Sequence, residues 1–407
     1  MTHSAISRWK ALIDRKAAMV SSARSRGWGM ADVIGDPVRR HVAVGDRSGG
    51  KRFIGHLHAF RGFAILNIVA IHAWWAQIFF FRGDEAAIGG RVLNAVNETL
   101  FHDSTLYFAL ISGLLFSLVL QSRGWGTFFK SKLLNVASPY IAMTLVFTWF
   151  AWDWRGSVLS GEVEAFSSFD GSATDYLAKV GENVLSGGAI FHFWYIPILS
   201  LLYVATPLLA WVLAHASTRW LIWPVIVAPL AFSRTFPDFS WGTVIYFVGA
   251  YAAGVFIGTQ YERAISIIHR HRNALLLVAV LTSAALLAAY LLDYDKLGPI
   301  SVRETLFYVQ KLSVAALVLL HLRSLEGRIP EWLNTLGTYA FSIYFLHVPI
   351  QALILQLEWQ FFPHVLPGLA IVAMGAFSFV VGLMGSVMLS GFARNVMGTR
   401  SRMLLGA

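Results

Sequence analysis

Long apolar stretches alternate with short polar segments along most of the chain. A helix of about 17–25 apolar residues crosses the hydrocarbon of a bilayer, and ten stretches have that length. They lie at residues 56–80, 99–121, 137–153, 192–214, 220–236, 241–260, 274–292, 304–321, 334–357 and 366–390. The pattern therefore predicts an all-α fold, a polytopic integral membrane bundle of about ten transmembrane helices.

Polar and basic segments flank this apolar region at both ends. Residues 1–53 hold eleven Lys or Arg and four Asp or Glu, without the apolar stretch of a signal peptide. Their helical spacing of apolar residues fits an amphipathic helix on an anionic membrane surface followed by a linker, and a short irregular tail is the alternative. We therefore divide the chain into a basic cytoplasmic tail (1–53), a membrane domain (54–390) and a second basic cytoplasmic tail (391–407).

Composition supports the membrane assignment and excludes some chemistry. Hydrophobic residues make up 57% of the chain and charged residues 13%, and the mean hydropathy is +0.61. A soluble protein has about twice that charged fraction. Cysteine is absent, which excludes a disulfide framework, a thiolate catalyst and a cysteine metal site. We expect no metal, and the net charge of +10 fits cytoplasmic loops better than nucleic-acid binding.

The distribution of Lys and Arg predicts the orientation of the bundle. With both termini inside, the inner segments hold twenty-three of these residues and the outer segments seven. Cytoplasmic loops carry such an excess of positive charge. We therefore expect a multi-pass protein of the plasma (inner) membrane with both termini cytoplasmic.

Two ionisable residues, Arg61 and His72, interrupt the first apolar stretch. Charged groups in hydrocarbon are costly and usually functional. Eleven residues at about 100° each come to about 20° more than three turns, so both residues share one helix face, about 16 Å apart along the axis. The predicted orientation puts Arg61 near the cytoplasm and His72 beyond the middle. Taken singly, Arg61 also fits a side chain that snorkels to the interface, and His72 a hydrogen-bonded interior residue.

Candidates on the cytoplasmic side of the bundle come from two segments. Ser112 and Gly113 are small and allow either close helix packing or passage of a ligand. Lys130 and Lys132 lie in a short inner segment. They fit the positive-inside pattern, and they also fit binding of the phosphates of a cytosolic donor.

Candidates nearer the outer side come from three segments. Trp194 and Tyr195 fit an interfacial aromatic belt or a surface on which a sugar stacks. Glu304 and Lys311 are seven residues apart on one helix face and are close enough in sequence to interact electrostatically. His347, two residues before a proline, is a second candidate base within the membrane, with a structural role as the alternative.

Together these segments resemble the acyltransferase-3 family of integral-membrane acyltransferases over about residues 54–390. The family has an arginine and a histidine separated by ten residues, as Arg61 and His72 are. The later motifs match Phe108, Ser112 and Gly113; Lys130, Lys132, Pro139 and Tyr140; His192, Trp194, Tyr195 and Pro197; and Ser342, Ile343, Tyr344 and His347. The chain departs from the family where Asn135 replaces a frequent Arg, where Lys replaces Arg at 130 and 132, and in lacking a hydrolase-like domain after the membrane part.

The resemblance implies transfer of an acyl group, usually acetyl, from cytosolic acyl-CoA to a hydroxyl. The acceptor is usually a cell-envelope or exported glycan or glycolipid, and membrane lipid and proteins of polysaccharide synthesis or export are the implied partners. We expect acetyl-CoA as donor and no metal. The outer loop 154–191 is expected to carry acceptor specificity.

The mechanism that we expect gives separate roles to these residues. Arg61, with Lys130, Lys132 and Ser112, binds the donor, and His72 acts as general base with His347 as a second catalytic or orienting group. The acceptor-binding residues are expected to be His192, Trp194, Tyr195, Glu304 and Lys311. Two alternatives stay open, a transporter or flippase of an envelope glycolipid and a non-catalytic subunit of a polysaccharide synthase.

Overall fold

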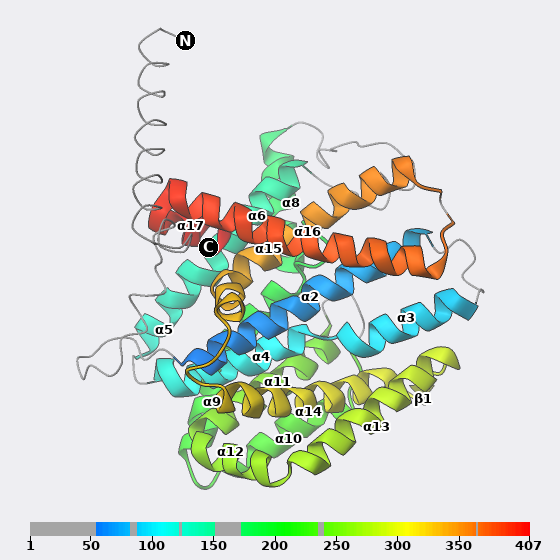
Figure 1. The fold of residues 1–407 in the computed structure, drawn as a ribbon. Coiled ribbons are helices and arrows are strands. Elements are labelled where there is room, and N and C mark those ends of the chain that lie inside the picture. The colour runs from blue at the N-terminus through cyan, green and yellow to red at the C-terminus, as the bar shows by residue number, and fades with distance from the viewer. Residues whose placement is uncertain (1–53, 82–87, 122–123, 151–171, 235–239, 364) are drawn as a thin grey trace, which may run out of the picture. The chain divides into compact units, whose positions relative to one another are not determined.

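The structure is a computed structural model that describes residues 54–81, 88–121, 124–150, 172–234, 240–363 and 365–407 (Figure 1). Within the described residues, a small hairpin of β1 (Lys296–Leu297) and β2 (Ile300–Ser301) accompanies an otherwise helical fold. The longer helices are α2 (Gly55–Phe81), α3 (Ile88–Phe101), α4 (Thr105–Leu115), α6 (Ser138–Phe150), α8 (Ala173–Ser186), α9 (Tyr195–Ala214), α11 (Trp241–Thr259), α12 (Tyr261–Arg270), α13 (Arg272–Leu291), α14 (Val302–Ser324), α15 (Glu331–Phe361) and α16 (Gly368–Met397). The short ones are η3 (Phe116–Leu120), α5 (Trp125–Lys132), η5 (Leu133–Ala137), η6 (Arg219–Leu221), α10 (Ile222–Val227), η7 (Ala228–Leu230), η8 (Gly398–Arg400) and α17 (Ser401–Leu405).

Among the described residues, nine helical segments are long and apolar enough to cross a membrane, which corrects the predicted ten. Nine of the ten predicted stretches overlap these segments. The exception is 220–236, where the structure has only a shorter apolar helix, Arg219–Leu230. This helix divides into η6, α10 and η7, and it contains Pro224 and Pro229. Proline lacks the N–H that a helix needs, so a long regular helix does not form there.

The broken helix still carries the chain from one end of the bundle to the other. We call the end at which α2 begins the Arg61 end. His215, before the broken helix, lines a cavity together with Gln121 at the end of η3. Arg234, after it, binds Asp103 just before α4 begins. These two contacts lie at opposite ends of the α4–η3 segment, so the chain crosses between them.

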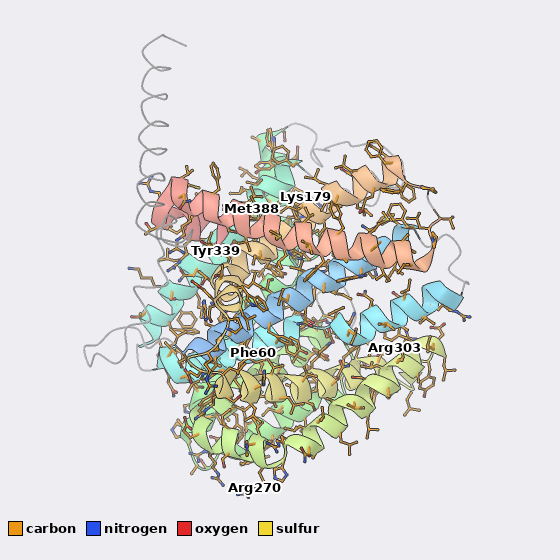
Figure 2. All side chains as sticks on the ribbon, in the orientation of Figure 1. Phe60, Lys179, Arg270, Arg303, Tyr339 and Met388 are labelled. Carbon is orange, nitrogen blue, oxygen red and sulfur yellow. The ribbon has the colours of Figure 1, made fainter. Side chains whose placement is uncertain are left out.

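Apolar side chains cover the outside of the bundle as well as its interior. Met388 of α16 is 71% exposed, whereas Phe60 of α2 is fully buried (Figure 2). Leu281 of α13 is also exposed. Such an apolar exterior is unfavourable in water and fits the hydrocarbon of a bilayer.

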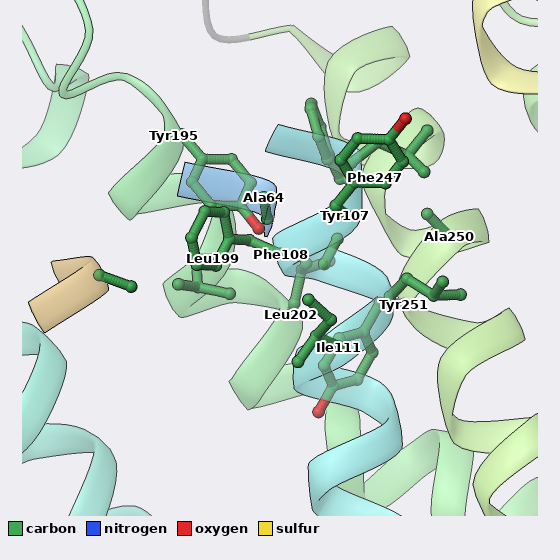
Figure 3. Packing of buried hydrophobic residues seen from close by; sticks show 14 of the residues in the cluster. Ala64, Tyr107, Phe108, Ile111, Tyr195, Leu199, Leu202, Phe247, Ala250 and Tyr251 are labelled. Carbon is green, nitrogen blue, oxygen red and sulfur yellow. The ribbon is translucent and has the colours of Figure 1, made fainter. Parts of the chain in front are cut away.

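Helix α2 lies in the interior of the bundle, where it contacts α15, α16, α4 and α14 (Figure 1). Glycines allow two helix pairs to approach closely. A side chain at Gly62 of α2 would overlap the carbonyl of Leu333 in α15. Likewise, a side chain at Gly113 of α4 would overlap the carbonyl of Tyr251 in α11, whose packing Figure 3 shows. Of the two alternatives for Gly113, close helix packing and passage of a ligand, the structure shows close packing of α4 on α11.

The last part of the predicted outer loop 154–191 is a helix, α8, that packs on α6. Tyr176 donates a hydrogen bond to the carbonyl of Leu145 (2.8 Å), and Tyr140 donates to the carbonyl of Asn183 (3.0 Å). The two helices therefore run antiparallel. Gly187 ends α8 with a φ of +78°, where a side chain would overlap the backbone of Trp194. This turn directs the following residues into the bundle.

The segment predicted as a basic tail, 391–407, is mostly helical and packed. α16 continues to Met397, and α17 then packs on α6. Ser138 Oγ donates to the carbonyl of Met403 (2.8 Å). Arg402 of α17 and Arg61 of α2 line one cavity, so the first and last described helices meet at the Arg61 end. The predicted amphipathic helix within residues 1–53 lies outside the described residues.

Candidate active site

Three histidines from separate parts of the chain meet inside the bundle. His72 comes from α2, His347 from α15, and His192 from the segment between α8 and α9. The ring centroids of His72 and His347 are 5.1 Å apart, and that of His192 lies 5.1 Å from His347 and 5.9 Å from His72. The turn at Gly187 and the close packing of α2 on α15 bring these rings together.

The hydrogen bonds of His347 determine which nitrogen of His72 is basic. Nδ1 of His347 lies 2.8 Å from the carbonyl oxygen of Ile343. A carbonyl only accepts, so this nitrogen carries the proton and Nε2 of neutral His347 has a lone pair. Nδ1 of His72 lies 2.9 Å from that Nε2 and donates to it. Nε2 of neutral His72 is then left with a free lone pair, the arrangement of a general base.

His192 is held by a reciprocal pair of hydrogen bonds with Tyr344. Its Nε2 donates to the carbonyl of Tyr344 (2.8 Å), and the Tyr344 hydroxyl donates to the carbonyl of His192. Burial lowers the pKa of His192 well below its usual value, and the adjacent imidazoles of His347 and His72 lower it further. His192 is therefore neutral. Its buried Nδ1 has no hydrogen-bond partner among the described residues.

A cavity of about 340 Å³ lies at the Arg61 end of the bundle. Arg61, Lys132 and Arg402 bring positive charge to its lining, and the ammonium of Lys132 lies 4.1 Å from the ring centroid of Tyr203. A π-helical turn, η5, follows Lys132, and π-helical turns are frequent at functional sites. The other lining residues include His58, Ser112, Asn135, Tyr195 and Tyr344.

A smaller pocket of about 70 Å³ adjoins the histidines on the side away from Arg61. His72, His192 and Trp194 line it, together with the charged Asp103 and Arg234. Tyr344 lines both this pocket and the larger cavity, so the two spaces meet at this residue. The proposed base and the cationic cavity are therefore adjacent but belong to different compartments.

The charge of Arg234 is balanced inside the bundle. Its guanidinium binds Asp103, Glu304 (2.5 Å) and His102 Nε2 (2.8 Å). Burial disfavours the charge of Arg234, but the carboxylates of Asp103 and Glu304 outweigh this effect and raise its pKa. His102, Asp103 and Glu304 also have the spacing of metal ligands. In this structure they bind the guanidinium, which supplies the positive charge that a cation would bring.

Most of the predicted site residues divide between the large cavity and the small pocket. Ser112 and Tyr195 line the large cavity with Arg61 and Lys132, whereas Lys130 is exposed and does not line it. Trp194 lines the small pocket with His72 and His192. His347 contacts both of these histidines.

The predicted Glu304–Lys311 interaction has a different form. Glu304 binds Arg234, and the buried Lys311 donates to the carbonyl of Leu100 (2.9 Å). Among the described residues, these two side chains form no ion pair with each other. Neither lines the two cavities described above.

Sequence reasoning missed two cations of the site. Arg234 is not among the predicted site residues, because its contacts with Asp103 and Glu304 join residues far apart in the sequence. Arg402 was assigned to a tail. The signal that this tail forms a packed helix is the apolar Met-Leu-Leu sequence that directly follows Arg402.

An apolar helical bundle with hydrogen-bonded imidazoles in its interior, next to a cationic cavity, has the features that a membrane-embedded enzyme needs. The chain belongs to the acyltransferase-3 family: the family's sequence profile, described as "Acyltransferase domain", matches residues 54–389. This confirms the resemblance drawn from the motifs and makes the protein a multi-pass membrane acyltransferase. No curated protein and no solved structure matches the chain.

Proposed function

We propose that the protein transfers an acyl group, acetyl in the simplest case, from acyl-CoA to a hydroxyl of a cell-envelope or exported glycan. The donor occupies the cationic cavity at the Arg61 end. The acceptor hydroxyl enters the small pocket that His72 lines. The observation that carries this proposal is the hydrogen-bond chain Ile343–His347–His72, which leaves a lone pair on Nε2 of His72, a residue that lines the small pocket.

The proposed reaction needs only groups of this chain and its two substrates. Nε2 of His72 takes the proton of the acceptor hydroxyl, and the hydroxyl oxygen attacks the thioester carbonyl carbon. An oxygen–carbon bond forms as the carbon–sulfur bond breaks. The proton then passes from His72 to the thiolate of coenzyme A, which restores the base. To reach His72, the acyl-bearing arm of the donor passes beside Tyr344, which lines both compartments.

Tyr195 is the proposed hydrogen-bond donor to the thioester oxygen. It lines the donor cavity, is buried, and its hydroxyl has no hydrogen-bond partner among the described residues. A buried donor without a partner is unfavourable unless a ligand satisfies it. Negative charge develops on the thioester oxygen during attack, and a preorganised hydroxyl stabilises it.

The proposed acceptor site combines an aromatic ring with balanced charge. Trp194 lines the small pocket beside Asp103 and Arg234. Carboxylate and guanidinium groups hydrogen-bond to the hydroxyls of an uncharged polyol, and an indole face packs against a sugar ring. Together with the family, these features support a glycan acceptor. The excess of Lys and Arg in the segments at the Arg61 end supports a cytoplasmic donor cavity.

The test uses purified protein in lipid nanodiscs with labelled acetyl-CoA and an extract of envelope glycans. We expect base-labile label on glycan, and a loss of about 10²–10⁴-fold in rate for His72→Ala. His269→Ala, which changes an exposed histidine of α12, is the matched control and should retain full activity. Normal acylation by His72→Ala would contradict the proposed base. Glycolipid crossing without any label would favour the transporter instead.

A further inference from the structure

Three cations line the donor cavity, and no Asp or Glu of the described residues lines it. They are Arg61, Lys132 and Arg402, from α2, α5 and α17. None of the three forms an ion pair with a carboxylate in the part of the chain that the structure describes. Like charges around one cavity repel each other, and such an arrangement attracts an anion. Its charge therefore fits a ligand with several phosphate groups.

The third cation belongs to a short helix that is fixed in place. Ser138 Oγ of α6 donates to the carbonyl of Met403 (2.8 Å), and Ser401 Oγ lies within hydrogen-bonding distance of the carbonyl of Gly398 and of a main-chain oxygen of the last residue, Ala407. Gly406, just after the helix, also lines the cavity. The backbone at Arg402 is thus anchored, while its side chain is exposed and accessible to a ligand.

We propose that Arg402 binds a phosphate group of the acyl-CoA donor, which makes α17 part of the donor site. This inference rests on the proposed function. Coenzyme A carries a diphosphate and a separate 3′-phosphate, so cations from three different helices give its phosphate groups partners in different directions. Arginine binds phosphate with two parallel hydrogen bonds, which adds geometric selectivity to charge.

The consequence is selection among thioester donors. Arg402 favours a donor that carries the phosphates of coenzyme A, and it contributes nothing to the binding of S-acetylpantetheine, which has none. The chemistry takes place at the histidines, and Arg402 lines the donor cavity but not the small pocket that His72 lines. Its removal should therefore weaken donor binding and leave the turnover number unchanged.

The experiment measures binding of coenzyme A to the full-length protein in nanodiscs, and KM and kcat for acetyl-CoA and S-acetylpantetheine. We expect Arg402→Ala to raise the Kd for coenzyme A about tenfold, as loss of one charge-assisted hydrogen-bonding group predicts. KM for acetyl-CoA should rise similarly, and KM for S-acetylpantetheine should not change. Arg402→Lys should recover part of the affinity. Arg400→Ala removes an exposed arginine that does not line the cavity, and it should match the wild type.

The outcomes separate this inference from the proposed function. If the wild type binds coenzyme A and both Arg402→Ala and Arg402→Gln bind it equally well, the role of Arg402 is overturned and the proposed function stands. Equal losses of affinity in Arg402→Ala and Arg400→Ala also overturn it, because they indicate a general effect of net charge. If the wild type itself does not bind coenzyme A, the donor assigned under the proposed function is wrong, and with it the role of Arg402.

Discussion

Nε2 of His347 accepts a hydrogen bond of 2.9 Å from Nδ1 of His72, and a main-chain carbonyl fixes the proton of His347 on its other nitrogen. Two uncharged groups, an imidazole and the carbonyl of Ile343, therefore orient the proposed base. A buried carboxylate in that position would have to be desolvated, which is costly. This arrangement orients His72 without that cost. When His72 becomes an imidazolium, its hydrogen bond to His347 and the hydrogen bond from His347 to the carbonyl of Ile343 polarise each other.

Removal of the His347 side chain should lower activity while leaving the fold intact. In His347→Ala, Nδ1 of His72 loses its acceptor, and the ring is free to rotate or to change tautomer. Misplacement of a reacting group by about 1 Å costs about 10²-fold in rate, so we expect a loss of that order in kcat. KM for acetyl-CoA should change little, because His347 does not line the donor cavity.

The conservative variant His347→Gln provides the control. Its amide oxygen supplies a new acceptor, so it should recover part of the rate lost in His347→Ala. Steady-state kinetics on protein of matched thermal stability would measure both. A rise in KM with unchanged kcat in His347→Ala would contradict the orienting role.

Tyr195→Phe tests the proposed stabilisation of the thioester oxygen. The change removes one hydroxyl and keeps the buried ring beside Leu199 and Phe108 (Figure 3). Loss of one such donor typically costs about 10²–10³-fold in kcat. Single-turnover measurements with acetyl-CoA would isolate the chemical step. Tyr339→Phe, which alters a tyrosine outside both cavities, should react at the wild-type rate, and equal rates in Tyr195→Phe would exclude the proposed role.

Much of the fold was predictable because membrane helices are long and apolar. Nine of the ten predicted stretches correspond to candidate spans, since length and hydropathy alone determine whether a helix crosses hydrocarbon. The tenth, 220–236, has enough apolar residues, but Pro224 and Pro229 divide it into short segments. Hydropathy does not register the missing N–H groups of the two prolines, so the prediction of one long helix was wrong there, although the chain still crosses the bundle.

The geometry of the site was predictable only where one helix carries two of its residues. The spacing of Arg61 and His72 gave their common face, because helical periodicity is local. The contact of His72 with His347 joins α2 to α15, and the place of His192 depends on the turn after α8. Such contacts depend on the packing of distant segments. A single sequence therefore gave the motif residues through family resemblance but not their hydrogen bonds.

Arg234→Met should destabilise the protein strongly. The change leaves the buried carboxylate of Asp103 and the partly buried carboxylate of Glu304 without their shared partner. Breaking a buried ion pair by removing one partner costs about 3–5 kcal/mol of the free energy of unfolding. Lys179→Met is the control, because the Lys179–Glu182 pair is exposed and worth less than about 1 kcal/mol. Thermal unfolding in one detergent would compare them, and similar losses would refute the structural role of Arg234.

The neutral state of His192 predicts a loss of stability in mild acid. Its pKa is near 6.5 in the unfolded chain and well below that in the fold, where burial and then His347 and His72 lower it. Below pH 6.5 the unfolded state binds a proton that the folded state does not, so stability falls with pH. Between pH 7.5 and 5.5 this amounts to about 1.4 kcal/mol.

His192→Asn should lack that part of the pH dependence. Its amide keeps a donor for the carbonyl of Tyr344, so the local backbone is supported. Unfolding curves at both pH values would give the difference between the variant and the wild type. His269→Asn, at an exposed position, should retain the wild-type dependence. If the free energy of unfolding of His192→Asn depended on pH as that of the wild type does, His192 would bind a proton in the folded state as readily as in the unfolded chain.

The cysteine-free sequence allows a direct test of orientation. His269 lies before α13 and Lys296 lies after it, so the two exposed positions are on opposite sides of one membrane-spanning helix. We expect a membrane-impermeant maleimide to label Lys296→Cys in intact spheroplasts, and to label His269→Cys only after lysis. This result follows from the excess of Lys and Arg at the Arg61 end. The reverse labelling would place the cationic cavity on the outer face, where cytosolic acyl-CoA does not reach it, and would exclude the proposed donor.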